Sequence, residues 1–169
     1  MAVRTDRHGI MAEENAEARE RILELLQKAY WMEIETVMSY LAGSVNPDGV
    51  RAQEIKESLE QDIEEELGHA KQFANRIKEL YGVVRGSLDF AAEQSFLQPA
   101  EEQTDVVHLI RGVIEAETGA IEHYHRIIEE TDQVDWVTQD MVIAILHDEE
   151  AHRRLFEGFL REYEAEGLA

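Results

Sequence analysis

Two groups of acidic and histidine residues occur at corresponding places in the two halves of this chain. Each half has one lone glutamate followed, at nearly the same distance, by a Glu-x-x-His pair: Glu33, Glu66, His69, Glu117, Glu149 and His152. Residues three apart lie on one face of a helix. Four carboxylates and two imidazoles form the ligand set with which four helices hold two divalent cations in their common core. The repeat therefore predicts a dinuclear metal site.

The four glutamates fall on the apolar stripes of their helices. Glu33 lies between Ala29 and Thr36, and the other three occupy equivalent places. An unpaired ionised carboxylate in a core costs several kcal/mol, which is a large part of the stability of a domain. No lysine or arginine shares these stripes, whereas two divalent ions balance four carboxylates and two neutral histidines. The sequence therefore predicts that metal ions supply the counter-charge.

Two tyrosines repeat with the ligands. Tyr40 follows Glu33 by seven residues and Tyr124 follows Glu117 by seven, so each phenol lies two turns along the same helix face. We expect the phenols to donate hydrogen bonds to ligand carboxylates.

The remaining acidic and histidine residues show no such pattern. Four glutamates near the ligands point away from the stripes, and we expect them to be solvated: Glu35, Glu64, Glu65 and Glu150. Five histidines are expected to have surface or packing roles: His8, His108, His123, His125 and His147.

Apolar periodicity predicts four long helices, over about 14–42, 50–81, 104–130 and 136–165. Asn46-Pro47-Asp48-Gly49 predicts a turn between the first two helices, and Gly82 is a candidate C-terminal cap. Residues 82–103 lack a sustained period and are predicted to form a crossover. We expect an all-α bundle of two antiparallel hairpins joined by this crossover, with residues 1–13 as a flexible N-terminal segment and 14–165 as the domain.

Composition restricts the function classes. The formal charge of −21 disfavours binding to nucleic acid or to anionic membranes. The absence of cysteine excludes thiolate sites, iron–sulfur clusters and disulfides. Residues 1–15 lack the apolar core of a signal peptide, and no stretch is long and apolar enough for a membrane span. A cytoplasmic protein is the simplest expectation.

With these motifs the chain resembles the ferritin-like superfamily of di-iron carboxylate proteins, and bacterioferritin in particular. The resemblance spans about 29–160 and is strongest in DMVIAILHDEEAH at 140–152. It implies that one iron has the terminal ligands Glu33 and His69, and the other Glu117 and His152. It further implies that Glu66 and Glu149 bridge both ions, and Tyr40 is similar to the tyrosine that the family places beside the centre.

The chain also departs from known family patterns. Leu67 stands where haem-binding bacterioferritins have their haem-ligating methionine, so no haem is expected there. The chain stops soon after Leu160, which leaves little room for the fifth helix of 24-subunit cages. Ala120 replaces a second glutamate of rubrerythrin-like peroxidases, and their cysteine-rich module is missing. The DNA-protecting mini-ferritins, which bind iron between subunits, fit less well.

The resemblance implies a ferroxidase that binds two Fe(II) ions and oxidises them with O2 or H2O2 for iron storage or detoxification, in a homo-oligomer. The same ligands suit a di-manganese or mixed Fe/Mn oxidase or catalase, and a non-catalytic metal-buffering or assembly subunit is a third reading. The residues leave open the native metal, the oxidant, the size of the oligomer and whether haem binds elsewhere.

Overall fold

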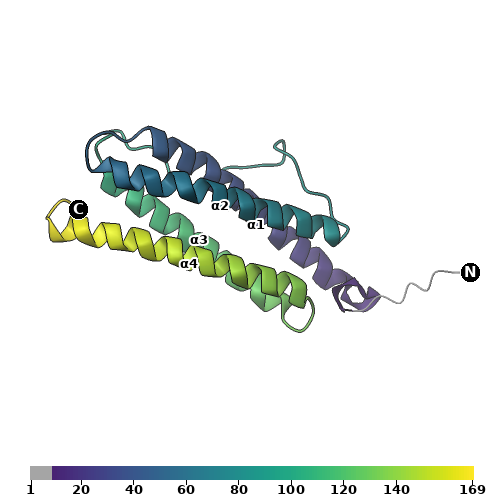
Figure 1. Ribbon diagram of the computed structural model, residues 1–169. Helices are drawn as coiled ribbons and strands as arrows, with labels where there is room; N and C mark the ends of the chain where they lie inside the picture. The colour runs from purple at the N-terminus through teal and green to yellow at the C-terminus, as the bar shows by residue number, and fades with distance from the viewer. Residues whose placement is uncertain (1–8) are drawn as a thin grey trace, which may run out of the picture.

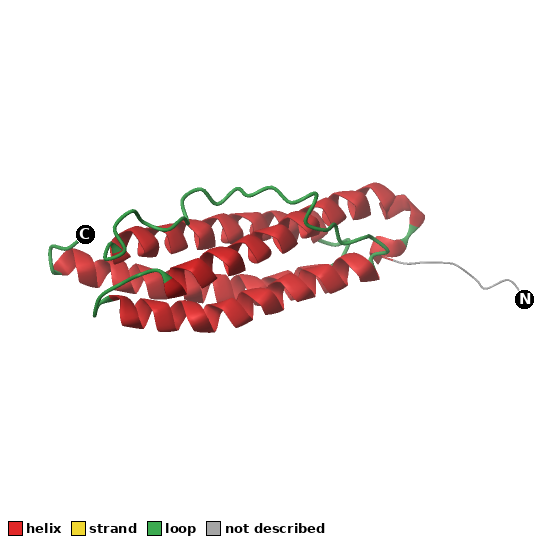
Figure 2. Ribbon diagram, turned by 90° about the horizontal axis from the view of Figure 1, so that it is seen from above, coloured by secondary structure: helices red, strands yellow, loops and turns green. Residues whose placement is uncertain are grey.

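The computed structural model describes residues 9–169, and these form a bundle of four long helices (Figure 1). The helices are α1 (Ala16–Val45), α2 (Ala52–Glu79), α3 (Val106–Thr131) and α4 (Trp136–Ala165). α1 pairs with α2 and α3 pairs with α4 as antiparallel hairpins, and residues 80–105 run along the outside of the bundle from one end to the other (Figure 2). The predicted all-α architecture with a long crossover is confirmed. None of these helices is both long enough and apolar enough to cross a membrane.

α1 continues past its predicted end. Gly43 is buried within the helix, which ends at Val45, two residues before Pro47, and proline disfavours a further helical turn. The N–H of Asn46 still donates to the carbonyl of Ala42 at 3.0 Å. Pro47, and not Gly43, which directly follows the predicted end, therefore sets this boundary.

α2 ends in a Schellman motif that is shifted by one residue from the expected cap. The N–H of Gly82 donates to the carbonyl of Ile77 at 2.9 Å, and the N–H of Tyr81 donates to that of Lys78 at 3.1 Å. The residue in the left-handed conformation is Tyr81, with φ of 65°. Gly82 is needed for a different reason, since a Cβ at this position would lie 2.6 Å from a methyl group of Leu23. The glycine therefore permits close packing of α2 against α1.

Aspartates cap the N-termini of the second hairpin. The side chain of Asp105 accepts the N–H of His108 at 3.0 Å, and that of Asp135 accepts the N–H of Thr138 at 3.1 Å. Both bonds satisfy backbone donors that a helix start leaves without a partner. These caps fix where α3 and α4 begin, and so fix the level of the ligands on each helix.

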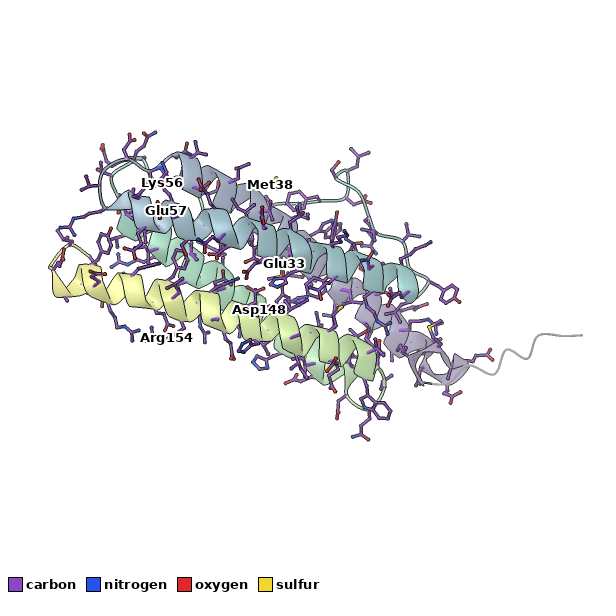
Figure 3. The ribbon with its side chains drawn as sticks, viewed as in Figure 1. Glu33, Met38, Lys56, Glu57, Asp148 and Arg154 are labelled. Carbon is purple, nitrogen blue, oxygen red and sulfur yellow. The ribbon has the colours of Figure 1, made fainter. Side chains whose placement is uncertain are left out.

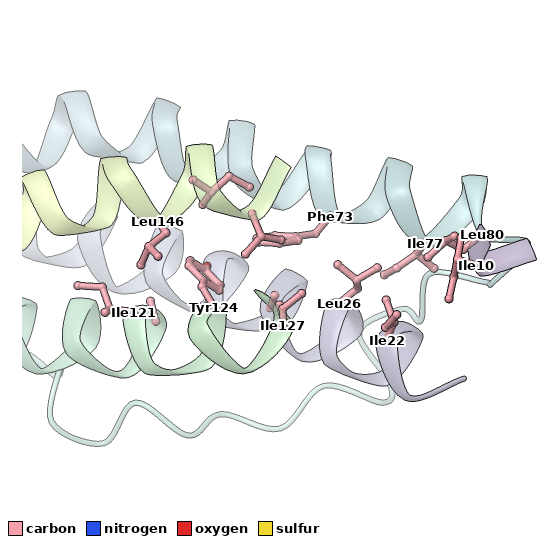
Figure 4. Packing of buried hydrophobic residues seen from close by; sticks show 14 residues of the cluster. Ile10, Ile22, Leu26, Phe73, Ile77, Leu80, Ile121, Tyr124, Ile127 and Leu146 are labelled. Carbon is pink, nitrogen blue, oxygen red and sulfur yellow. The ribbon is translucent and has the colours of Figure 1, made fainter. Parts of the chain in front are cut away.

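The apolar core is divided into two clusters along the bundle. One cluster contains Ile22, Leu26, Phe73, Ile77, Tyr124 and Ile127 (Figure 4). The other contains Tyr40, Ile55, Leu59, Ile110, Val113 and Phe156. On every helix the candidate ligands lie between residues of these two clusters. The clusters therefore close the two ends of the polar site.

The crossover is fastened to α1 by a carboxylate that the sequence suggested would be solvated. Glu35 is buried, and its carboxylate accepts the backbone N–H groups of Glu93 at 2.9 Å and Gln94 at 2.7 Å. The Gln94 amide in turn donates to the hydroxyl of Thr36 at 2.7 Å. The expectation for Glu35 was wrong because the crossover covers its helix face.

Part of the N-terminal segment packs on the bundle. Residues 1–8 lie outside the described residues, whereas η1 (Gly9–Met11) and η2 (Glu13–Asn15) are short 3-10 turns. Ile10 is buried in the same apolar cluster as Ile22 and Leu80. The ordered contacts of the domain therefore begin before residue 14.

A buried ion pair ties the end of α2 to the start of α4. The guanidinium of Arg76 donates to Asp135 at 2.8 and 3.0 Å and to the hydroxyl of Thr138 at 2.8 Å. The side chain of Asp135 is only 2 % exposed. Because α2 and α4 belong to different hairpins, this pair helps to hold the hairpins together.

We predict that Arg76→Leu destabilises the metal-free protein by about 3 kcal/mol, because it leaves the buried Asp135 carboxylate without its counter-charge. Urea unfolding followed by circular dichroism measures this difference. Lys71→Leu, an exposed change on the same helix, is the matched control and should alter the unfolding free energy by no more than about 0.5 kcal/mol. Equal effects of the two substitutions would contradict a stabilising role for the pair.

Candidate metal centre

The six ligand candidates converge in the middle of the bundle. The four glutamates are at most 2 % exposed, and His69 and His152 are 4 % and 8 % exposed. α1 and α3 each contribute one glutamate, while α2 and α4 each contribute a Glu-x-x-His pair. Figure 3 shows Glu33 on α1 and Asp148, which precedes the candidate ligand Glu149 on α4, at a similar level of the bundle. The structure thus brings together all six residues that the repeat singled out.

These residues form two overlapping groups, each able to surround one ion. In each group, one ligand atom from every residue lies within 4.8 Å of the others. The first group is Glu33, Glu66, His69 and Glu149, and the second is Glu66, Glu117, Glu149 and His152. Glu66 and Glu149 belong to both groups. Two carboxylates shared between two sites are placed to bridge a pair of cations.

The Nδ1 atoms of the two histidines and the carboxylates of Glu66 and Glu149 lie close together at the centre of the site. Nδ1 of His69 lies 3.1 Å from Glu149 and 3.4 Å from Glu66. Nδ1 of His152 lies 3.5 Å from Glu66 and 3.6 Å from Glu149. Despite these distances, neither nitrogen makes a hydrogen bond, nor does either oxygen of Glu66. Buried polar atoms without partners are rare in proteins, and oxygen and imidazole donors in this arrangement fit divalent metal ions.

The two tyrosines lie beside the site and cross between helices. The hydroxyl of Tyr40 on α1 donates to Glu117 on α3, and the hydroxyl of Tyr124 on α3 donates to Glu33 on α1. Burial, together with the neighbouring carboxylates, raises the pKa of both phenols well above its usual value. The phenols therefore stay protonated and hold the two outer glutamates in place. The expected hydrogen bonds to ligand carboxylates are present.

The two glutamates of α1 and α3 favour the protonated state in the metal-free protein. Burial raises the pKa of Glu33 well above its usual value, and the charges of Glu66 and Glu149 raise it further. Burial does the same for Glu117, again helped by Glu149 and Glu66. Removing these groups from water disfavours their charged form.

The residues of α2 and α4 favour the charged state. Burial alone would raise the pKa of Glu66, but the two imidazoles outweigh it and lower the pKa to about 2. The pKa of Glu149 is lowered in the same way, against burial and the charge of Glu66. Burial would lower the pKa of both histidines, but Glu149 and Glu66 outweigh it and raise the pKa to about 10 for His69 and about 12 for His152.

Protons can therefore replace metal ions as the counter-charge. Two ionised glutamates and two protonated histidines sum to zero, as do four ionised glutamates, two neutral histidines and two divalent cations. With neutral histidines, metal ions would be the sole source of positive charge, as the sequence predicts. In the structure the two histidines can carry that charge themselves, while the arrangement of the six residues still fits a pair of metal ions.

An outer layer of carboxylates, which sequence reasoning missed, contacts the far side of each histidine. Nε2 of His152 lies 3.1 Å from Glu65 and 3.9 Å from Asp62, and Nε2 of His69 lies 3.4 Å from Asp148. Glu65 was expected to be purely solvated, but its exposed carboxylate also accepts from His152. The sequence contains a sign of this layer, because an acidic residue directly precedes the glutamate of the Glu-x-x-His pair in both halves. Burial raises the pKa of Asp62 to about 6.

The other histidines that the structure describes lie outside the two ligand groups. His123 is buried, and its Nε2 donates to the carbonyl of Leu25 at 2.8 Å, which is a packing role. His108 bonds the crossover at the carbonyl of Gln98, and His125 and His147 are exposed. His8 lies outside the described residues.

Comparison with known proteins agrees with this geometry. The model of the ferritin-like domain matches residues 23–165, which include all six ligand candidates. The chain belongs to the ferritin-like family. It is 32 % identical over 145 residues to the "DNA protection during starvation protein" of Pyrococcus furiosus, covering 83 % of this chain and 77 % of that protein. It is 25 % identical over 148 residues to the bacterioferritin of Desulfovibrio desulfuricans, covering 87 % and 78 %.

Solved structures of other ferritin-like proteins share the fold. A dodecameric thioferritin from Bacteroides fragilis superimposes with a TM-score of 0.76 at 24 % identity, covering 88 % of this chain and 89 % of that one. The bacterioferritin of Desulfovibrio desulfuricans, described with a diiron site, gives 0.75 at 23 % identity, covering 88 % and 83 %. This ferritin-like chain is thus similar both to bacterioferritin and to a protein named for DNA protection, although its residues suggested a poorer fit to the latter group.

We predict that binding of two divalent ions at pH 7 releases at least two protons. The pKa of His69 and His152 is raised to about 10 and about 12 in the metal-free protein, so each must lose its proton to become a ligand. The raised pKa of Glu33 and Glu117 adds to this release. Affinity should accordingly rise with pH. Calorimetric titration with Zn(II) in buffers of different ionisation enthalpy counts the protons. Release of fewer than two would show that the metal-free core is not protonated in this way.

Proposed function

We propose that the protein is a ferroxidase that binds two Fe(II) ions in the bundle core and oxidises them with O2 or H2O2. The observation that carries this proposal is the overlap of the two ligand groups at Glu66 and Glu149. Shared carboxylates hold two ions close enough to give up their electrons to one oxidant. A structural site for a single ion would need only one of the groups.

The donor set suits this chemistry. Carboxylate oxygens are hard ligands that favour Fe(III) over Fe(II), while imidazoles suit iron in either state. Two Fe(II) substrates supply two electrons, which with two protons reduce H2O2 to two water molecules or O2 to H2O2. Manganese accepts the same ligands, so the choice of Fe rests on the family to which the chain belongs.

The chain's own residues have distinct roles in this proposal. Glu33 and His69 would hold one ion, Glu117 and His152 the other, and Glu66 and Glu149 would bridge them. Tyr40 and Tyr124 keep the carboxylates of Glu117 and Glu33 at the site through hydrogen bonds from groups that do not ionise. The apolar clusters on both sides limit the entry of bulk water.

Removal of Fe(II) and its oxidant serves iron storage or detoxification, and it also protects DNA from damage. A relative is named for DNA protection, yet a chain with a formal charge of −21 repels nucleic-acid phosphate. We therefore assign any protective effect to consumption of Fe(II) and the oxidant, and not to contact with DNA.

We further propose that the chain assembles into a homo-oligomer. One structural neighbour is described as dodecameric. Large apolar side chains are exposed on the first hairpin, at Met38, Leu41, Val45 and Leu67, and such exposed apolar surface is typical of interfaces. Light scattering coupled to size exclusion should report the mass of several chains, and a monomer would contradict the assembly.

We predict that Glu66→Ala removes iron oxidation, because it takes away a carboxylate that both ions share. In stopped-flow absorbance with Fe(II) in air, the wild type should oxidise two iron per chain in the fast phase, and the variant should fall to the rate of iron in buffer. The measurement is repeated with H2O2 to identify the preferred oxidant.

Glu64→Ala is the matched control, since Glu64 is exposed and two residues away on the same helix. It should keep the wild-type rate and stoichiometry. A wild type that binds Fe(II) without oxidising it would favour a metal-buffering or structural role. Turnover of H2O2 with Mn(II) and not with Fe(II) would favour the manganese catalase alternative.

A further inference from the structure

The outer carboxylates follow the internal repeat of the chain except at one position. Glu65 and Asp148 each directly precede a ligand glutamate, and each contacts the histidine of the opposite helix at 3.1 and 3.4 Å from Nε2. Glu65 contacts His152, and Asp148 contacts His69. These two contacts are therefore equivalent in the two halves of the chain.

Asp62 breaks that symmetry. It lies four residues before Glu66 on α2, and the corresponding residue on α4, four before Glu149, is the buried apolar Ile145. Asp62 is 6 % exposed, its Oδ1 lies 3.9 Å from Nε2 of His152, and its Oδ2 makes no hydrogen bond. His152 therefore faces two outer carboxylates, whereas His69 faces one.

A buried carboxylate without a full set of partners costs free energy that a buried apolar residue, such as the one found at the equivalent position, would not cost. In the part of the chain that the structure describes, Asp62 pairs with His152, which is a candidate ligand. Its position thus points to an effect on the ion that His152 would hold.

We propose that Asp62 makes the two metal subsites unequal, so that the subsite with His152 and Glu117 binds a divalent cation more tightly and fills before the subsite with His69 and Glu33. This inference rests on the proposed dinuclear site. The negative charge of Asp62 attracts a cation more strongly at the nearer subsite, because Coulomb attraction falls with distance. Together with Glu65 it also keeps the proton of His152 on Nε2, which leaves Nδ1 free for the ion. Asp62 is a positioning residue, since it acts through His152.

The test is an anaerobic titration of the metal-free full chain with Co(II), followed by the visible absorbance of the bound ion. The wild type should bind two ions in two separate steps. Asp62→Asn, which keeps the shape of the side chain and removes its charge, should weaken the first step by about tenfold and leave the second nearly unchanged. Glu64→Gln, an exposed change of the same charge on the same helix, should alter neither step.

Two further variants assign the steps to subsites. Glu117→Ala should abolish the tight step, whereas Glu33→Ala should retain it and lose the weak one. Circular dichroism of each metal-free variant verifies that the bundle is folded before titration.

The outcomes separate this inference from the proposed function. Two ions bound with equal affinity by the wild type, or Asp62→Asn with both steps unchanged or both equally weakened, would overturn the role of Asp62 while leaving a dinuclear centre in place. Retention of the tight step in Glu117→Ala would also overturn it. A wild type that binds fewer than two ions would overturn the dinuclear centre itself, and the inference with it.

Discussion

Neutralisation of four carboxylates inside an apolar bundle is the constraint to which the rest of this molecule conforms. The core can satisfy it in two ways that have the same net charge. In one, two histidines and two glutamates carry protons, and in the other two divalent cations take their place. Because the net charge is the same in both cases, the proposed exchange of protons for metal ions adds no unpaired charge to the core.

The fold supplies the geometry that this exchange needs. Each hairpin contributes one lone glutamate and one Glu-x-x-His pair, and only the packing of one hairpin on the other closes the site. The two apolar clusters lie on either side of the candidate ligands along the bundle axis, so packing holds the helices in place around the polar residues. The crossover allows the second hairpin to start at the required end of the bundle, and Glu35 and Gln94 hold it against α1.

Contacts of residues that follow a repeated pattern were readable from the sequence, whereas contacts made by the crossover and by side chains off the apolar stripes were not. The six candidate ligands, the two tyrosines and the hairpins follow from periodicity and repetition. Glu35 could not be predicted as buried, because the residues that cover it lie in a crossover without a period. Gly82 suggested the cap, but the left-handed position fell on Tyr81, since a close contact with Leu23 needed the glycine. Glu65 and Asp148 act on histidines of the opposite helix, which spacing along one helix does not reveal.

The repeat also explains why the two sides of the site differ in chemistry. α1 and α3 contribute carboxyl groups that accept hydrogen bonds from buried phenols, and burial raises the pKa of these carboxyl groups well above its usual value. α2 and α4 contribute the histidines, the shared glutamates and the outer carboxylates, and the side chains of Glu65 and Asp148 are 57 % and 46 % exposed. A continuous set of acidic and imidazole groups thus leads from the surface to the core between α2 and α4. Asp62 extends that set on the half that contains His152 and not on the other, and the proposed inequality of the two subsites rests on this departure from the internal symmetry of the sequence.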